Sequence, residues 1–276
     1  DQALSLVFAK TPEELDRQFD AWLREWTAGL AIEPRRSPEV VARLRLRLEL
    51  EPPAEGAARA RWADDWCSVA WGAWQAGVVV DAEEALRRVE RAGLSPARAE
   101  FLRGEMALKR GDRAAAKVAW SAGFDLGGEE FRARMGLGRV LLDEGDFAGA
   151  ERQFAAAERD FPGFDEPALS AELHLAQVYA REERTEDVFR ARERWLAWES
   201  DDYPLRLQVA RWHAEGGRHE RAAELYREAN EIDPFRRELH LAWGRSLLAL
   251  AVSEELAALF EQSLTARSAQ LRAVLA

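Results

Sequence analysis

Cysteine is the scarcest residue of this chain, with Cys67 the single example among 276 residues. One cysteine cannot form an internal disulfide, and it cannot supply a cysteine-based zinc site. Its neighbours Trp66, Val69 and Ala70 are apolar. We therefore predict that Cys67 is a buried structural thiol and not a reactive one.

Histidine is also scarce, with four residues and no His-Glu-x-x-His motif. That scarcity removes the usual ligand set of a zinc hydrolase. His213 falls at an aromatic position of the repeat described below, and we predict that it packs in the core. We predict structural roles for His174 and His240 as well. The pair Gly136-x-Gly138 lacks the preceding strand and the third glycine of a dinucleotide-binding motif. We expect no metal, no cofactor and no catalytic role for these residues.

Positive charge is in deficit, because 39 Lys and Arg residues face 50 Asp and Glu residues, giving a net charge of −11. Nucleic acid is therefore excluded as the expected partner, since binding to phosphates depends on clustered cations. No apolar run approaches the roughly 20 residues that cross a bilayer. We expect a soluble chain. The first residue is Asp1 and not Met, which is compatible with a cytoplasmic protein and with an exported one whose signal peptide has been removed.

Strand signals are few, and Val78-Val79-Val80 is the only β-branched run. From residue 12 onward the chain shows apolar positions at three- and four-residue spacing, in segments of about 12 to 18 residues separated by Gly, Pro and Asp. This pattern predicts an all-α fold. Short breaks between the segments predict antiparallel neighbouring helices.

Internal repetition has a period of 34 residues. One unit carries Leu137-Gly138, Ala150, Phe154 and Pro162, and the unit from Tyr203 repeats the same small, aromatic and proline offsets. In such a repeat, small residues allow the two helices of a unit to approach, aromatic residues such as Phe154 fill the space between units, and stability accumulates by stacking. These offsets resemble the tetratricopeptide repeat family. The resemblance implies a right-handed superhelical solenoid of antiparallel helix pairs that binds proteins or peptides.

The repeat divides the chain into three parts. Residues 1–56 form a non-consensus helical pair, which starts at Thr11 as a capping residue, and residues 51–56 form the hinge after it. Residues 57–265 hold about six repeats, and residues 266–276 form a C-terminal capping helix. The Gly163 to Pro167 loop carries an insertion of four residues, which should bend the stack. The predicted repeats start near residues 63, 97, 131, 169, 203 and 237.

Acidic pairs and tryptophans are the remaining conspicuous features. The pairs Asp64-Asp65, Glu129-Glu130 and Asp201-Asp202 are predicted at or before helix starts, where they complement the helix dipole. Trp66 is predicted in the core. Trp71 and Trp74 fall at offsets that face the groove in the family, and the alternative is that they pack against residues 12–52.

The family's groove positions fall on residues that are basic or neutral with the exception of Glu105. A basic lining in an acidic chain favours an acidic peptide or a C-terminal carboxylate as the partner, and the alternative is a set of solvated helix faces. The candidate peptide-binding residues are Trp71, Trp74, Arg98, Lys109, Arg132, Arg139, Gln177, Arg181, Arg211 and Arg245.

Three functional hypotheses remain open. The first is a protein-interaction scaffold with a peptide in the groove. The second is the non-catalytic tail of a larger bacterial protein, because residues 6–16 and 19–23 resemble the closing helix of metallopeptidase-like domains, and the catalytic part would then lie upstream of Asp1. The third is a groove that holds a small molecule, which would require a closed apolar pocket.

Overall fold

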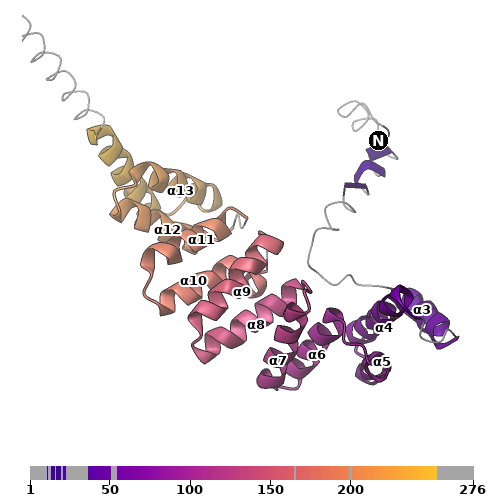
Figure 1. The fold of residues 1–276 in the computed structure, drawn as a ribbon. Helices are drawn as coiled ribbons and strands as arrows, with labels where there is room; N and C mark the ends of the chain where they lie inside the picture. Colours follow the sequence, from indigo (N-terminus) through magenta and orange to yellow (C-terminus); the bar gives the residue numbers. More distant parts are fainter. Residues whose placement is uncertain are drawn as a thin grey trace, which may run out of the picture. The chain divides into compact units, whose positions relative to one another are not determined.

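The computed structural model describes residues 11, 14–15, 17–19, 21–22, 37–50, 55–164, 166–198 and 201–253 (Figure 1). Within these ranges every regular element is helical, which confirms the predicted all-α fold. The predicted capping helix at residues 266–276 lies outside the described residues. So do residues 51–54 of the predicted hinge and most of the stretch that resembles a metallopeptidase domain. At residue 11 the predicted cap is present, because the Thr11 hydroxyl accepts a hydrogen bond from the Glu14 backbone N–H at 3.3 Å.

The helices follow one another along the chain with short connections, and helical residues 237–253 come after the last of them. Their bounds are α3 Pro38–Leu50, α4 Ala57–Gln75, α5 Val79–Arg91, α6 Ala97–Lys109, α7 Arg113–Asp125, α8 Phe131–Glu144, α9 Phe147–Asp160, α10 Ala171–Arg181, α11 Thr185–Leu196, α12 Tyr203–Glu215 and α13 His219–Ile232.

Sequential helices pack as antiparallel pairs: α4 with α5, α6 with α7, α8 with α9, α10 with α11 and α12 with α13. The chain divides into two compact units, unit 1 at Asp1–Phe164 and unit 2 at Asp165–Ala276. In unit 1, α6 also contacts the first helices of the neighbouring pairs, α4 and α8. The division falls in the loop where the four-residue insertion was placed. The bend expected from that insertion stays a prediction.

Three first helices begin where a repeat was predicted to start, at Ala97, Phe131 and Tyr203. Helix α4 begins at Ala57, six residues before residue 63, so the prediction that Asp64-Asp65 stands at a helix start is wrong. Both residues lie inside α4, and the Asp65 carboxylate instead accepts a hydrogen bond from Arg47 of α3 at 2.6 Å.

Helix α10 begins at Ala171, close to the start predicted near residue 169. Residues Pro167–Leu169 form a single 3-10 turn, and the Ser170 hydroxyl then accepts a hydrogen bond from the Leu173 backbone N–H at 3.1 Å. A serine at this position is a favoured N-cap, so it sets the start of the helix. The displacement is two residues.

The other acidic pairs do cap helices, as predicted. Glu130 accepts a hydrogen bond from the Ala133 backbone N–H at the start of α8, and Asp202 accepts one from Leu205 at the start of α12. At the opposite ends, the residues before Pro162 and Pro234 have extended backbone, because the proline ring excludes the helical conformation there. Cap and proline together delimit the α8–α9 and α12–α13 pairs.

Glycine and aromatic residues meet inside the pairs of unit 1. A Cβ atom added at Gly138 would lie 2.6 Å from the Phe154 ring, and one at Gly104 would lie 2.3 Å from the Trp120 ring. Trp120 also lies against Gly136 of the next pair, at 2.4 Å from such an atom. Trp120 therefore fills the space between pairs, as predicted for the aromatic position, while Phe154 packs against a glycine of its own pair.

The buried residues confirm most of the predicted core. Cys67 is fully buried, Trp66 is 2% exposed and His213 is 6% exposed. In unit 2 one cluster of buried side chains joins α11, α12, α13 and residue 239. Its members are Trp195, Leu196, Val209, Ala210, Ala222, Leu225, Tyr226, Ala229 and Leu239.

Candidate functional site

The first helices of unit 1 carry six of the ten predicted groove residues, which are Trp71, Trp74, Arg98, Lys109, Arg132 and Arg139. Within α6, Glu105 and Lys109 are four residues apart and share a face, as Arg132 and Arg139 do within α8 at a separation of seven. Helix α6 contacts both α4 and α8, and the positive charge of Arg132 on α8 acts on the Glu105 carboxyl of α6. We call the set Trp74, Glu105, Lys109, Arg132 and Arg139 the first-helix face.

Trp74 and Lys109 are brought together across two helices. The Lys109 ammonium lies 4.7 Å from the centre of the Trp74 ring, which is within the range of a cation–π contact. The indole is half-buried and the lysine is exposed. An aromatic surface with a cation beside it is suited to a peptide that carries both apolar and acidic side chains.

Trp71 does not belong to this face, and its assignment to an exposed groove is wrong. Its side chain is 5% exposed, and the indole N–H donates a hydrogen bond to the Arg98 backbone carbonyl at 3.2 Å. This bond joins α4 to α6, and the alternative, packing against residues 12–52, stays a prediction. Trp71 is a structural contact between adjacent pairs.

Arg98 is likewise directed toward α4. Its guanidinium donates hydrogen bonds to the Asp64 backbone carbonyl at 3.1 Å and to the Ser68 hydroxyl at 3.2 Å. The side chain is half-buried. These bonds make Arg98 a tie between two first helices, so it is a weaker candidate for a ligand contact than the exposed cations.

Glu105 is the one carboxylate of the first-helix face. Burial raises the pKa of the Glu105 carboxyl above its ordinary value, and the positive charge of Arg132 opposes this shift. The carboxylate is therefore held in a desolvated position beside the exposed cations. The negative charge of Glu105 partly offsets the positive charges of the exposed cations.

This environment predicts the effect of Glu105→Gln. Because the folded chain holds the Glu105 proton more tightly than the unfolded chain, the carboxyl favours folding at low pH, and that contribution is lost as the pH rises through the raised folded pKa. At neutral pH the neutral amide avoids the desolvated charge, so we expect a gain within about 1 kcal/mol. Thermal unfolding of both proteins measured across the acidic range should show the difference shrinking as the pH falls; a constant difference would contradict this account.

Arg132 and Arg139 are exposed and form no ion pair within the described residues. Other cations of unit 1 have carboxylate partners on neighbouring helices: Arg113 lies 2.7 Å from Asp143, and Arg134 lies 2.6 Å from Asp160. The first-helix face therefore presents two exposed guanidiniums whose charge no carboxylate pairs with among the described residues.

The remaining predicted residues lie in unit 2. Gln177 and Arg181 are four residues apart on α10, Arg211 is on α12, and Arg245 is in the helical residues 237–253. All four side chains are exposed, and the three arginines form no ion pair within the part of the chain that the structure describes. Whether they act together with one another or with unit 1 stays a prediction.

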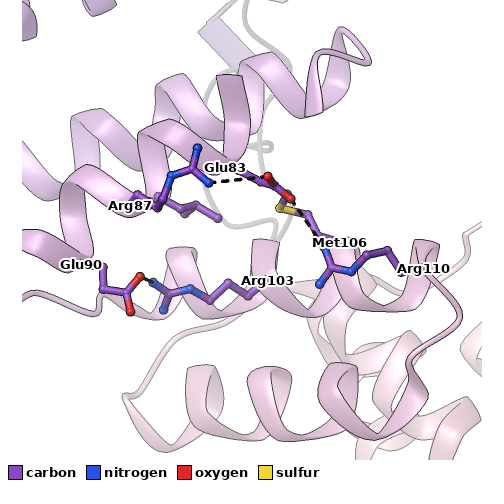
Figure 2. A pocket seen from close by; sticks show the side chains of 7 residues that line it. Glu83, Arg87, Glu90, Arg103, Met106 and Arg110 are labelled. Carbon is purple, nitrogen blue, oxygen red and sulfur yellow. Dashed lines mark ion pairs between the residues drawn. The ribbon is translucent and has the colours of Figure 1, made fainter. Parts of the chain in front are cut away.

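A cavity of about 190 Å³ lies elsewhere on unit 1, between α5 and α6 (Figure 2). Its floor includes Leu86 and Met106. Glu83 lies 3.7 Å from Arg87 and 3.9 Å from Arg110, and Figure 2 shows it between them. At the other end Arg103 lies 3.7 Å from Glu90 and pairs with Glu100.

This cavity differs from the first-helix face in position and in charge. Arg103, Met106 and Arg110 lie on another side of α6 than Glu105 and Lys109. Each arginine that lines the cavity already faces a carboxylate of the chain itself. The positive charges of this lining are therefore balanced by carboxylates of the chain itself. We expect the cavity to attract a charged ligand less strongly than the first-helix face does.

The histidines form structural contacts. The His213 ring accepts a hydrogen bond from the Arg218 Nε–H at 3.0 Å through Nδ1, and Nε2 lies 2.9 Å from the Glu193 carboxylate. Burial acts to raise the pKa of Glu193, but hydrogen bonds from Arg221 and His213 outweigh it and the net pKa is lowered. Within the described residues no three His, Cys, Asp or Glu side chains are arranged to hold a metal ion. No helix among them is long and apolar enough to span a membrane.

Comparison with known proteins gives fold neighbours at low identity. No family model and no curated protein matches the chain. Among solved structures, YrrB, described as a TPR protein with an unusual peptide-binding site, is 16% identical, covers 76% of this chain and 97% of its own, and has a TM-score of 0.49. TTC0263, a TPR protein of Thermus thermophilus, is 19% identical over 67% of this chain and 99% of its own, with a TM-score of 0.37.

The Cut9–Hcn1 hetero-tetramer of the APC/C is 15% identical, with a TM-score of 0.43. This match covers 76% of the present chain but only 39% of the other. At such identities the likeness concerns the fold alone. The chain itself shows a succession of antiparallel helix pairs, in which glycine and aromatic residues are matched at the repeat offsets.

Proposed function

We propose that the protein is an interaction scaffold whose first-helix face binds an acidic segment of a partner polypeptide. The observation that carries this proposal is the exposure of Arg132 and Arg139 without an ion pair among the described residues. In a chain of net charge −11, two such guanidiniums on α8, together with the Trp74–Lys109 pair that joins α4 to α6, favour a ligand that supplies the missing carboxylates.

The physical basis of recognition is local. Long-range attraction is weak because the whole chain and its ligand are both negative, and screening further limits it at physiological salt. Affinity must then come from short charge-assisted hydrogen bonds to Arg132 and Arg139 and from apolar contact with Trp74. Affinity should therefore decrease as salt is added.

The test uses a random peptide library selected on the full chain and on two variants. Arg132→Glu/Arg139→Glu reverses both charges of the first-helix face. Its matched control, Arg152→Glu/Arg159→Glu, reverses two arginines on α9 that are exposed and form no ion pair within the described residues. Both variants change the net charge equally, so a general effect of charge would affect them alike.

We expect the wild-type chain to enrich peptides that contain Asp and Glu. The affinity of a selected peptide, measured by fluorescence anisotropy, should fall at least about tenfold in Arg132→Glu/Arg139→Glu, since each hydrogen bond to a charged group contributes roughly 1.5–3 kcal/mol. The α9 variant should bind like the wild type. Selected peptides without acidic residues, or equal losses in both variants, would reject the proposal.

A further inference from the structure

Unit 2 contains a buried histidine whose two ring nitrogens face groups of opposite charge. His213 lies on α12 and is 6% exposed. Its Nε2 lies 2.9 Å from the carboxylate of Glu193 on α11. Its Nδ1 lies 3.0 Å from Nε of Arg218, the residue that precedes α13. The imidazole therefore joins three helices through both of its nitrogens.

These two contacts fix the position of the proton on the neutral ring. The guanidinium of Arg218 keeps all its hydrogens in proteins, so Arg218 Nε–H donates and Nδ1 of His213 accepts. The single proton of the neutral imidazole must then be on Nε2, where it donates to the Glu193 carboxylate. The surroundings of His213 thus select the tautomer that is protonated at Nε2.

A second proton can enter the ring only at Nδ1, the atom that accepts from Arg218. Two N–H groups, each belonging to a cation, would then point at one another across the 3.0 Å between the nitrogens. That arrangement is repulsive, so Arg218 has to move away when the ring is protonated. Arg218 keeps a partner when it moves, because its Nη1 lies 3.2 Å from the carboxylate of Glu186 on α11.

Glu193 stabilises the protonated ring. Burial opposes the charge of Glu193, but hydrogen bonds from Arg221 and His213 outweigh burial and hold the pKa of Glu193 below its ordinary value. Glu193 therefore keeps its negative charge in mildly acidic solution and can form an ion pair with the imidazolium. The titratable and charged side chains around the ring are Glu186 and Glu193 on α11, Arg218 before α13, and His219, Arg221 and Glu224 on α13.

Arg218 also covers an aromatic ring. Its guanidinium lies 3.9 Å from the centre of the Trp212 ring, a cation–π contact. The same indole stacks on Phe189, with 4.9 Å between the ring centres and 11° between the planes. One arginine thus contacts both the nitrogen that takes up the proton and the neighbouring indole. Displacement of Arg218 would leave the Trp212 ring without this cation.

We propose that His213 and Arg218 form a pH-sensitive switch, in which protonation of His213 at Nδ1 displaces Arg218 and uncovers the Trp212 ring. The proton comes from solvent, and its loss as the pH rises lets Arg218 return to Nδ1. The switch lies within unit 2 and does not depend on the first-helix face. A chain that fails to bind acidic peptides can still show it.

The test is NMR on the full chain with nitrogen-15 in histidine and arginine, from about pH 8 to about pH 5. The sequence has only four histidines, so each ring can be followed separately. At the higher pH we expect the Nε2–H tautomer of His213 and a nuclear Overhauser contact between Arg218 and the Trp212 ring. At the lower pH both nitrogens of His213 should carry a proton, and that contact should be lost with the same midpoint.

Two glutamine variants and a fluorine label on tryptophan extend the test. The Trp212 resonance is assigned by its loss in Trp212→Phe, and in the wild type it should shift with the midpoint of His213. His213→Gln keeps a donor for Glu193 but cannot titrate, so the pH-dependent shift should be lost. His219→Gln is the matched control, because it removes the histidine that begins α13, and the shift should remain.

Several outcomes would overturn the proposal. One is an Nδ1–H tautomer of His213 at the higher pH, and another is an Arg218–Trp212 contact that persists after the ring is protonated. Unfolding of the chain before His213 takes up a proton, or equal loss of the Trp212 response in both glutamine variants, would also reject the switch. The first two observations use the wild-type chain, so they decide the question even if His213→Gln does not fold.

Discussion

Gly138→Ala is expected to lower the free energy of unfolding, although alanine is the better helix former. Helix propensity alone predicts a gain of about 1 kcal/mol. The added Cβ would lie 2.6 Å from the Phe154 ring, which is fully buried and has no room to move away. Overpacking of this kind costs about 1–3 kcal/mol, so packing outweighs propensity.

The control comes from the same repeat position in another pair. Gly244 is helical and, in the described structure, has nothing within 4 Å of an added Cβ. Gly244→Ala should therefore raise stability by up to about 1 kcal/mol, in line with propensity. Thermal and urea unfolding of both variants show whether each substitution raises or lowers the free energy of unfolding. If both substitutions stabilise the chain, the close contact between Gly138 and Phe154 is not a constraint.

Trp195→Ala should be the most destabilising single substitution that we consider, at about 3–5 kcal/mol. Trp195 is 1% exposed and belongs to the buried cluster that joins α11, α12 and α13. Truncation leaves a cavity that the surrounding helices cannot close. Amide hydrogen exchange across α10 to α13 should be accelerated.

Trp198→Ala is the matched comparison, because the same substitution is made three residues later on an exposed side chain. We expect a change within about 0.5 kcal/mol and no change in hydrogen exchange. A large loss of stability in Trp198→Ala would show that this indole is needed for folding.

The sequence predicted the helix pairs well because each pair depends on local patterns. The caps at Glu130 and Asp202, the prolines after α9 and α13, and the small residue at Gly138 act within about one repeat. The start of α4 was missed because no capping side chain marks it, and Gly56 precedes the helix without a side-chain hydrogen bond. Because the true start of α4 carries no such signal, the acidic pair Asp64-Asp65 gave the stronger, and incorrect, indication of a helix start.

The candidate site was predicted less completely, because it depends on which side chains meet in space. Trp71 and Trp74 both fall at repeat positions that face the groove in the family. Only the structure shows that the Trp71 indole N–H donates a hydrogen bond to the Arg98 carbonyl, 27 residues away.

The glycine–aromatic contacts also limit how this chain can be rebuilt from its own parts. Gly104 and Gly138 accommodate Trp120 and Phe154, whereas the same repeat position is Ala210 in the pair whose second helix carries Tyr226. The contact between the two helices therefore differs from one pair to the next, and recombination inside a pair would join helices whose surfaces no longer fit. Exchange of the α8–α9 pair as a whole would also have to keep Gly136 against Trp120.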